Sequence, residues 1–270
     1  MGTRSSSDRT TGVGSVEVGL RIVKAMVSLG QPAALSEVAD AAKMHPAKVR
    51  RYMVSFIRGG LIKQHPETGR YDLGPYGLDF SLAYLERLDA HKLGISVLNT
   101  LVEQLKESAF VAVWGTSGAT VINWQASRQP VYASTRIGTV FPLLASSTGR
   151  TFLAYLPPAD TEPLLKRELK ALAKTPNATI KGRKDVDQIV SEIRARGLTR
   201  GVGLRLPGIN SFSAPVFDRH GTITFTLTVF GYEDTFDCSW DGQIAVTLKS
   251  AAQMLSHQLG YFHHKATPVR

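Results

Sequence analysis

The sequence predicts an α+β protein in two parts: a small N-terminal domain of helices closed by a β-hairpin, and a larger domain with a mainly antiparallel sheet. The chain has 270 residues, which is long for one compact domain, and its 43% of hydrophobic residues suffice for two buried cores. Apolar residues recur at helical spacing up to residue 58, whereas short β-rich runs begin at residue 110. We therefore expect a mobile tail (1–14), a first domain (15–74), a linker helix (75–91) and a second domain (92–264).

The first domain begins with three predicted helices. The first ends at Gly30-Gln31-Pro32 and carries apolar residues at helical spacing, namely Val16, Leu20, Ile22, Val23, Met26 and Val27. Ser36 is a suitable N-cap for a second helix that reaches residue 42, because its hydroxyl can accept a free backbone N–H. Pro46 suits the first turn of a third helix, where its missing N–H needs no partner.

The third helix is predicted to have one apolar and one basic face. Its buried stripe comprises Val49, Tyr52, Met53, Phe56 and Ile57, and its exposed face comprises Ala47, Lys48, Arg51, Ser55 and Arg58. Gly59-Gly60 ends the helix. Residues 61–64 and 70–73 then read as two short strands around a turn at 65–69, so a β-hairpin follows.

Positive charge is concentrated in the third helix and the hairpin. The chain carries a formal net charge of +10, and residues 43–70 hold seven Lys or Arg against the single acid Glu67. Two helices joined by a short turn, the second apolar on one side and basic on the other, can set that second helix in the major groove of DNA. A merely solvated basic helix would not explain this order of elements. We therefore predict a winged helix-turn-helix that binds double-stranded DNA.

Nine residues are candidates for contacts to DNA: Ser36, Lys48, Arg50, Arg51, Ser55, Arg58, Lys63, His65 and Arg70. The basic residues on the exposed face of the third helix can bond guanine edges, and Ser55 lies among them. Arg50, at the flank of that face, is better placed for phosphate. The hairpin residues are candidates for phosphate or minor-groove contacts.

The second domain follows the linker helix. Leu78, Leu82 and Leu85 fit the linker helix, and a further helix starts after a break near His91. Strands are predicted at residues 110–114, 120–125, 131–137, 211–217 and 222–231. Helices are predicted at residues 148–155, 186–196 and 243–260. Strands interrupted by two helices and closed by a third indicate an α+β domain with a mainly antiparallel sheet.

Four motifs follow one another along the chain: LSEVA (35–39), HPETGRYDLG (65–74), GR with LA (149–150 and 153–154) and APVFD (214–218). In this order they resemble the IclR family of bacterial transcriptional regulators, and the resemblance covers residues 15–264. It implies a GAF-like effector domain and a homodimer held through the DNA-binding and linker region, often paired into a tetramer. It further implies a palindromic operator and control by a small organic acid, aromatic acids included.

The resemblance also indicates where an effector binds, namely at Ser147, Thr148, Gly201, Ser211, Thr228 and Phe230. The family often has His where this chain has Leu144, and an acidic cluster where it has residues 201–205, so this pocket should be less acidic. Arg205 is therefore a candidate partner for an effector carboxylate, or else a solvent-facing charge. Phe230 favours an apolar or aromatic effector, although core packing explains a strand Phe equally well.

Several other classes are excluded by missing motifs. Cys238 is the single cysteine, so the chain cannot build a disulfide or a cysteine zinc site by itself. The chain has no dinucleotide-binding glycine motif, phosphate loop or His-Glu-x-x-His, and the turn at 115–119 lacks the second glycine of a nucleophile elbow. We expect no enzymatic activity, cofactor or metal. No run nears the roughly 20 apolar residues of a membrane span, so we expect a cytoplasmic protein without membrane contact.

Two alternatives stay open at this point. One is a ligand-processing enzyme with an accessory domain that only resembles a DNA-binding one, and the other is an interaction module whose winged helix docks a protein. The enzyme would turn over an organic acid that a regulator binds unchanged. The interaction module would tolerate neutralisation of Arg51, whereas a regulator would lose DNA affinity.

Overall fold

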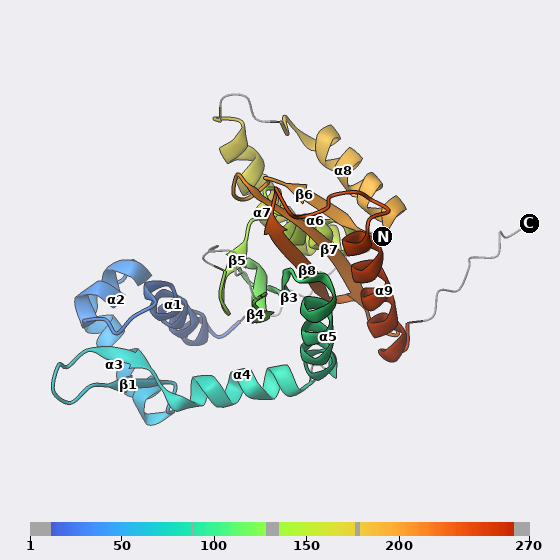
Figure 1. The fold of residues 1–270 in the computed structure, drawn as a ribbon. Coiled ribbons are helices and arrows are strands. Elements are labelled where there is room, and N and C mark those ends of the chain that lie inside the picture. Colours follow the sequence, from blue (N-terminus) through green and yellow to red (C-terminus); the bar gives the residue numbers. More distant parts are fainter. Residues whose placement is uncertain (1–11, 88, 128–134, 176–178, 262–270) are drawn as a thin grey trace, which may run out of the picture. The chain divides into compact units, whose positions relative to one another are not determined.

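The computed structural model describes residues 12–87, 89–127, 135–175 and 179–261. Contacts divide the chain into two compact units, residues 1–88 and 89–270, and each has a core of its own (Figure 1). Residues 1–11, most of the predicted tail, lie outside the described residues.

The first unit is a winged helix-turn-helix, as predicted. Its elements are α1 (Gly14–Leu29), α2 (Leu35–Ala42), α3 (Pro46–Arg58), β1 (Ile62–Gln64), β2 (Tyr71–Leu73) and α4 (Pro75–Arg87). The two strands pair antiparallel, with Ile62 opposite Leu73. A bridge between Ala33 and Tyr71 joins the hairpin to the segment between α1 and α2. The hairpin is thereby fixed to the helical part of the unit.

Helix α1 buries a different face from the one that its spacing predicted. Val16, Leu20 and Val27 are 57%, 53% and 59% exposed, whereas the buried residues are Gly19, Ile22, Ala25 and Met26. The helix is apolar on two sides, so spacing alone does not select the core face. Close packing selects it, because Gly19 admits Phe56 of α3 so closely that a Cβ would lie 3.1 Å from its ring.

Two details of α2 and α3 also differ from the prediction. Helix α2 begins at Leu35, so Ser36 lies inside the helix and Ala34 is the N-cap. Glu37 takes over the capping role, because its carboxylate accepts the Ala34 N–H at 2.6 Å. On α3, Ile57 was predicted to be buried but is 37% exposed. The buried stripe therefore ends at Phe56, which packs partly buried against the core.

The linker region is helical on both sides of residue 88, which lies outside the described residues. Helix α4 ends at Arg87 and α5 (Asp89–Leu105) begins two residues later, so His91 lies within α5 and the break predicted near it does not fall at that residue. Gly and Pro, the usual helix breakers, are absent from residues 78–93.

The second unit is an α+β domain whose described strands form one six-stranded sheet. The strands are β3 (Ser108–Gly115), β4 (Gly118–Gln125), β5 (Val140–Phe141), β6 (Thr199–Val202), β7 (Ile209–Phe217) and β8 (Ile223–Tyr232), in the spatial order β5-β4-β3-β8-β7-β6. After α5 its helices are α6 (Ser147–Tyr155), α7 (Pro158–Leu172), α8 (Arg183–Arg196) and α9 (Gln243–Gln258). All strand pairs in the sheet are antiparallel, which confirms the predicted sheet type.

Three elements of the second unit were missed from the sequence. Helix α7 contains Pro163, which argues against a helix in the sequence. Strands β5 and β6 have only two and four residues, which is too short for a clear strand pattern. The strand predicted at 131–137 is wrong over residues 135–137, which form no strand, and its other residues lie outside the described part of the chain.

Different helices cover the two faces of the sheet (Figure 1). Helices α5 and α9 pack against β3, β7 and β8, and α6 packs against β6, β7 and β8. On β8, Phe225 lies near Gly94 of α5, whereas Thr228 bonds Thr148 of α6. Side chains alternate along a strand, so these two residues, three apart, point to opposite faces. The face under α6 carries the hydroxyl groups of the candidate pocket.

Candidate DNA-binding surface and effector pocket

The basic face of α3 is exposed within the first unit. Pro46 occupies the first turn, and the His45 side chain caps the helix because its Nδ1 accepts the Ala47 N–H at 3.3 Å. Lys48, Arg51, Ser55 and Arg58 are all exposed. The first three of these, with Ser15 of α1, line one shallow hollow. This surface combines two cations with hydroxyl groups from α1 and α3.

Two further candidates are exposed as well. Ser36 is exposed on α2. Arg50 is exposed but lies one residue from Arg51, which is about 100° of turn around the helix. Arg50 therefore flanks the basic face of α3 without belonging to it.

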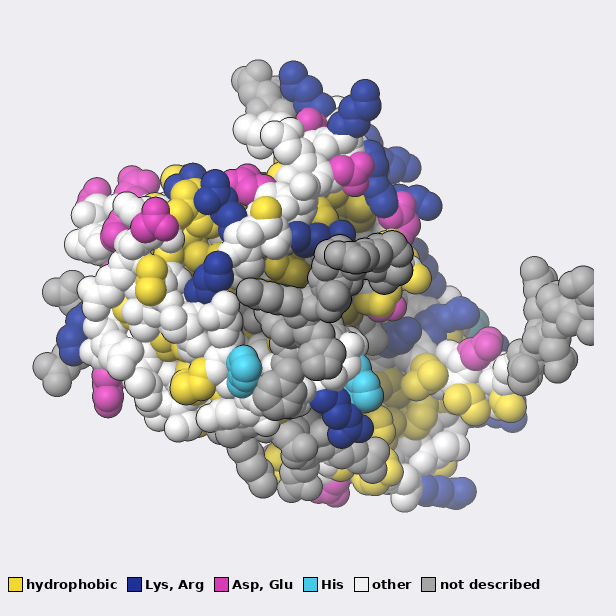
Figure 2. All heavy atoms as spheres, turned by 90° about the vertical axis from the view of Figure 1, so that its right-hand side faces the viewer, with side chains coloured by type: hydrophobic (Ala, Val, Ile, Leu, Met, Phe, Trp, Pro, Cys, Tyr) yellow, Lys and Arg dark blue, Asp and Glu magenta, His cyan; other side chains and the backbone are white. Residues whose placement is uncertain are grey.

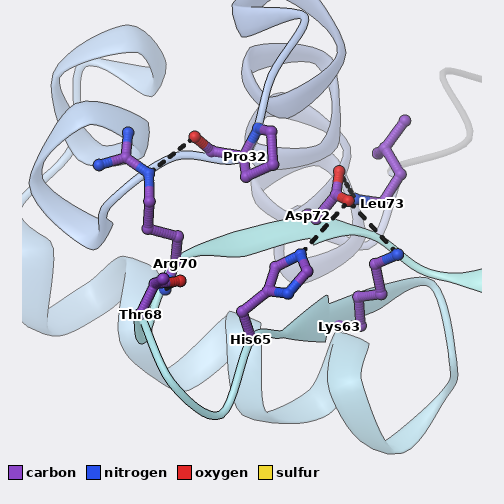
Figure 3. A network of polar contacts seen from close by, with 7 residues as sticks. All are labelled: Pro32, Lys63, His65, Thr68, Arg70, Asp72 and Leu73. Atoms are coloured by element: carbon purple, nitrogen blue, oxygen red, sulfur yellow. Dashed lines mark hydrogen bonds and ion pairs between the residues drawn. The ribbon is translucent and has the colours of Figure 1, made fainter.

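The hairpin carries its own acid, which pairs with two of the predicted DNA-contacting residues (Figure 3). Lys63 Nζ and His65 Nε2 lie 3.4 and 3.8 Å from Asp72 Oδ2. Burial by itself raises the pKa of Asp72, but the Leu73 backbone N–H, Lys63 and His65 outweigh it and hold the pKa below its ordinary value. Asp72 therefore stays ionised and reduces the positive charge of the hairpin.

Arg70 is engaged with the body of the first unit instead of projecting from the hairpin. Its Nε donates to the Pro32 carbonyl at 2.9 Å (Figure 3). Its Nη2 lies 2.6 Å from Glu37 Oε2. The residue is half-buried. Its guanidinium thus joins the hairpin to α2 and to the segment before it, a use that the basic pattern did not reveal.

The candidate effector pocket begins with pairs of hydroxyl groups between α6 and the sheet. Ser147 Oγ lies 2.8 Å from Ser211 Oγ, and Thr148 Oγ1 lies 3.0 Å from Thr228 Oγ1. Gly201 pairs with Ser211 across β6 and β7, and a Cβ on Gly201 would lie 2.6 Å from the Ser211 hydroxyl. Glycine is therefore required for this close approach.

These hydroxyls form one side of a hollow of about 510 Å³, its open mouth included. Its lining comprises Phe110, Thr135, Phe141, Ser146, Ser147, Thr148, Leu204, Arg205, Leu206, Ile209, Ser211, Thr228 and Phe230. Aromatic rings lie beside these hydroxyls, because Phe230 pairs with Ser211 across β7 and β8, and the Phe110 ring stacks on Phe141 at 5.0 Å and lies 5.7 Å from Phe230.

Six of the seven residues predicted from the sequence line this hollow together, and Gly201 lies directly behind Ser147 and Ser211. The sequence reading missed Phe110 and Phe141, which come from β3 and from short β5. The pairing of β3 beside β8 would have placed Phe110 next to Thr228, but strand order is not readable from one sequence.

Arg205 is the single charged residue among the described residues that line the hollow. Its Cζ lies 4.6 Å from the centre of the Phe141 ring. Within the described ranges no carboxylate lies at ion-pair distance from it. The described lining contains no acidic residue, and the guanidinium is free to meet an anion.

The segment before α6 is held by residues outside the pocket. Both carboxylate oxygens of Glu168 on α7 accept backbone N–H groups, from Leu143 at 2.7 Å and from Leu144 at 2.8 Å. Arg150 Nε donates to the Leu144 carbonyl at 2.6 Å. Gly149 packs so closely on Pro142 and Leu143 that a Cβ would collide with their backbone. The N-terminus of α6, with Ser147 and Thr148, is therefore fixed in place.

Family models match both units of the chain. Residues 15–66 match the IclR helix-turn-helix domain, and residues 82–257 match the C-terminal domain of the bacterial transcriptional regulator IclR. The chain belongs to the IclR family. Members of this family are DNA-binding transcriptional regulators and not enzymes, so this IclR-family chain is a DNA-binding transcriptional regulator as well.

Individual relatives agree with the family assignment. The crystal structure of HmgR from Pseudomonas aeruginosa is 35% identical, covers 94% of this chain and 100% of that one, and has a TM-score of 0.59. The transcriptional repressor IclR of Escherichia coli is 24% identical over 84% of this chain and 83% of its own. An IclR homolog from Microbacterium hydrocarbonoxydans, solved in complex with 4-hydroxybenzoate, is 15% identical, with a TM-score of 0.73 over 90% of this chain and 98% of that one.

Two classes of feature are absent from the residues that the structure describes. None of their helices is long and apolar enough to cross a membrane. In those same residues, no three His, Cys, Asp or Glu side chains are grouped so that they could hold a metal ion.

Proposed function

We propose that this regulator binds a palindromic operator as a homodimer or a dimer of dimers, and that a small organic acid bound in the second unit controls that binding. The observation that carries the proposal is the hollow under α6, where five predicted effector positions meet a sixth, Arg205, which is the single cation of the described lining.

The exposed face of α3 is the part of the first unit that reads the operator. Lys48, Arg51 and Arg58 supply the donors that guanine edges accept, and Ser55 supplies a hydroxyl. Arg50, which flanks this face, and Ser36, which is exposed on α2, suit phosphate contacts. Lys63 and His65 of the hairpin also suit phosphate contacts, but their pairing with Asp72 weakens their attraction for phosphate. We assign Arg70 to holding the hairpin instead of touching DNA, because Glu37 and Pro32 already engage its guanidinium.

The hollow suits an aromatic acid in particular. A guanidinium binds a carboxylate through two parallel hydrogen bonds, so Arg205 is the group that orients the acid. The rings of Phe110, Phe141 and Phe230 offer an apolar, aromatic wall for the remainder of the molecule. The Microbacterium homolog with its bound 4-hydroxybenzoate supports this class of ligand.

Dimer formation would cover the apolar residues that the first unit leaves exposed. On α1 these are Val16, Leu20 and Val27, and on α4 they include Leu78, Phe80 and Leu82, which are 62%, 70% and 47% exposed. Effector binding then acts by changing the separation of the two winged helices through residues 75–91. Two winged helices that bind adjacent major grooves must lie about 34 Å apart, so a modest rotation of one relative to the other abolishes DNA binding.

Calorimetric titration of the full-length protein with benzoate-type acids tests the effector half of the proposal. The wild type should bind at least one aromatic acid without turning it over, and Arg205→Gln should weaken that binding by about tenfold or more. Arg167→Gln, an exposed arginine on α7 outside the hollow, is the matched control and should bind as the wild type does. Equal affinity in wild type and Arg205→Gln would contradict the assignment of Arg205.

A further inference from the structure

A second hollow in the second unit borders α6 but shares no lining residue with the effector pocket. It encloses about 410 Å³ with its mouth and is lined by Arg150, Ile189, Glu192, Ile193, Leu198, Thr199, Arg200 and Trp240. These residues come from α6, α8, β6 and the segment before α9. We call it the Arg150–Arg200 hollow.

Arg150 is the inner cation of this hollow. It is half-buried, its Nε donates to the Leu144 carbonyl, and burial lowers the pKa of its guanidinium. Among the described residues no carboxylate lies at ion-pair distance from it. Taking a guanidinium out of water is costly unless an anion or other acceptor replaces the lost hydration. The remaining donors of Arg150 are not closed off from solvent, so they are available to an anion that enters the hollow.

Arg200 is the outer cation, and Trp240 holds it in place. Its Cζ lies 4.5 Å from the centre of the Trp240 ring, and its Nη1 donates to the Cys238 carbonyl at 3.1 Å. The Cζ of Arg196 lies 4.1 Å from the same ring centre. Two guanidinium groups thus contact the Trp240 ring, and Trp240 itself lines the hollow.

The acid in the hollow is already paired. Glu192 Oε1 lies 3.0 Å from Arg196 Nε, which leaves Arg150 and Arg200 without a carboxylate partner in the described residues. Figure 2 shows Lys and Arg side chains, with some Asp and Glu, at the top of the view, the height at which α8 lies in Figure 1. Ile189, Ile193 and Leu198 supply the apolar part of the lining.

We propose that the Arg150–Arg200 hollow binds a small oxyanion, a carboxylate or a phosphate group, separately from the effector. Two guanidiniums present the paired donors that planar carboxylate and phosphate oxygens accept. The bound anion would join α6 to β6, which the hydroxyls of Thr151 and Thr199 already connect at 2.7 Å. The same two elements carry Ser147 and Gly201 of the effector pocket.

Fluorine NMR of the full-length protein labelled with 5-fluorotryptophan tests this site directly, because the chain has only three tryptophans. Sodium phosphate and sodium acetate are titrated separately, with sodium chloride at equal ionic strength as the control. The Trp240 resonance, assigned with Trp240→Phe, should shift saturably, while the Trp114 resonance should not. Arg150→Gln and Arg200→Gln should each weaken the apparent affinity by about tenfold or more.

The control variants separate this site from the effector pocket. Arg205→Gln and Arg167→Gln should leave the Trp240 titration unchanged, so the result does not depend on where the effector binds. A saturable shift of the Trp240 resonance with phosphate, with acetate or with both supports the site and shows which class of anion it binds. No saturable shift beyond that in chloride would overturn the proposal. Arg200 is exposed on an edge strand, so Arg200→Gln should fold even if Arg150→Gln does not, and a titration unchanged in Arg200→Gln would also overturn it.

Discussion

Ser147 Oγ on α6 lies 2.8 Å from Ser211 Oγ on β7, and Gly201 of β6 lies directly behind this pair. A Cβ on Gly201 would approach the Ser211 oxygen to 2.6 Å and the Ser147 Cβ to 3.3 Å. The two hydroxyls can meet at the edge of the pocket only because residue 201 has no side chain.

Gly201→Ala should therefore weaken effector binding more than it weakens the fold. The added methyl group pushes Ser211 out of position, which should lower effector affinity by about tenfold and the free energy of unfolding by about 1 kcal/mol. Calorimetric titration and urea unfolding measure the two effects. Gly182→Ala, at a position with open space around its Cβ, is the control. Unchanged effector affinity in Gly201→Ala would place the ligand away from this edge.

The contact between Arg70 and Glu37 should stabilise the first unit by a modest amount. Both side chains are partly exposed, at 39% and 47%, so a coupling energy of about 0.5–1 kcal/mol is expected. A double-mutant cycle of Arg70→Gln and Glu37→Gln, read by thermal unfolding, measures it. Zero coupling would show that the pair does not hold the hairpin and would return Arg70 to the candidates for DNA contact.

Thr226→Val should stabilise the second unit. The Thr226 hydroxyl is buried on β8 and has no hydrogen-bond partner among the described residues, so folding removes it from water without replacement. Valine has the same shape without the hydroxyl, and the free energy of unfolding should rise by about 1 kcal/mol. Thr228→Val, which removes a hydroxyl bonded to Thr148 and Ser213, should destabilise instead. Urea unfolding of both variants distinguishes the two cases.

Glu107 should make the stability of the protein depend on pH. Burial raises the pKa of this carboxyl from 4.5 to about 7, so the folded state keeps the proton longer than the unfolded state does. Ionisation of Glu107 therefore destabilises the folded state. This destabilisation is absent below the pKa of the unfolded state, grows as the pH rises towards the pKa of the folded state, and is complete above it. The Glu107→Gln variant cannot ionise at this position. Its free energy of unfolding relative to wild type should therefore be about 1 kcal/mol higher at about pH 8 than at about pH 4, because partial exposure of the residue reduces the effect. If the free energies of unfolding of Glu107→Gln and wild type differ by the same amount at both pH values, the raised pKa of Glu107 is contradicted.

The elements that the sequence predicted well are those whose pattern is strong and local. Helix α3 begins at a proline and carries one apolar and one basic face, and β7 and β8 are long runs of strand-forming residues. The core face of α1 could not be predicted, because Val16 and Ile22 lie on two equally apolar sides and only the close approach of Phe56 to Gly19 chooses between them.

The pocket was predicted in part because its hydroxyls lie at motif positions of the family. Its aromatic wall was not, since Phe110 and Phe141 meet only through the order of strands in the sheet. The contacts of Arg70 within the first unit were missed for a related reason. Its partner Glu37 is 33 residues away in the sequence, and composition cannot show such a pairing.

The measurement that tests the central claim most directly is fluorescence anisotropy on an operator selected by the full-length protein from random double-stranded DNA. Wild type, Arg51→Ala and the matched control Arg167→Ala are compared with and without an aromatic acid that the protein binds. We expect Arg51→Ala to lose about 1–3 kcal/mol of specific binding, Arg167→Ala to bind as the wild type does, and the acid to change wild-type affinity. Failure to select any sequence, or equal operator affinity in wild type and a folded Arg51→Ala, would contradict the account.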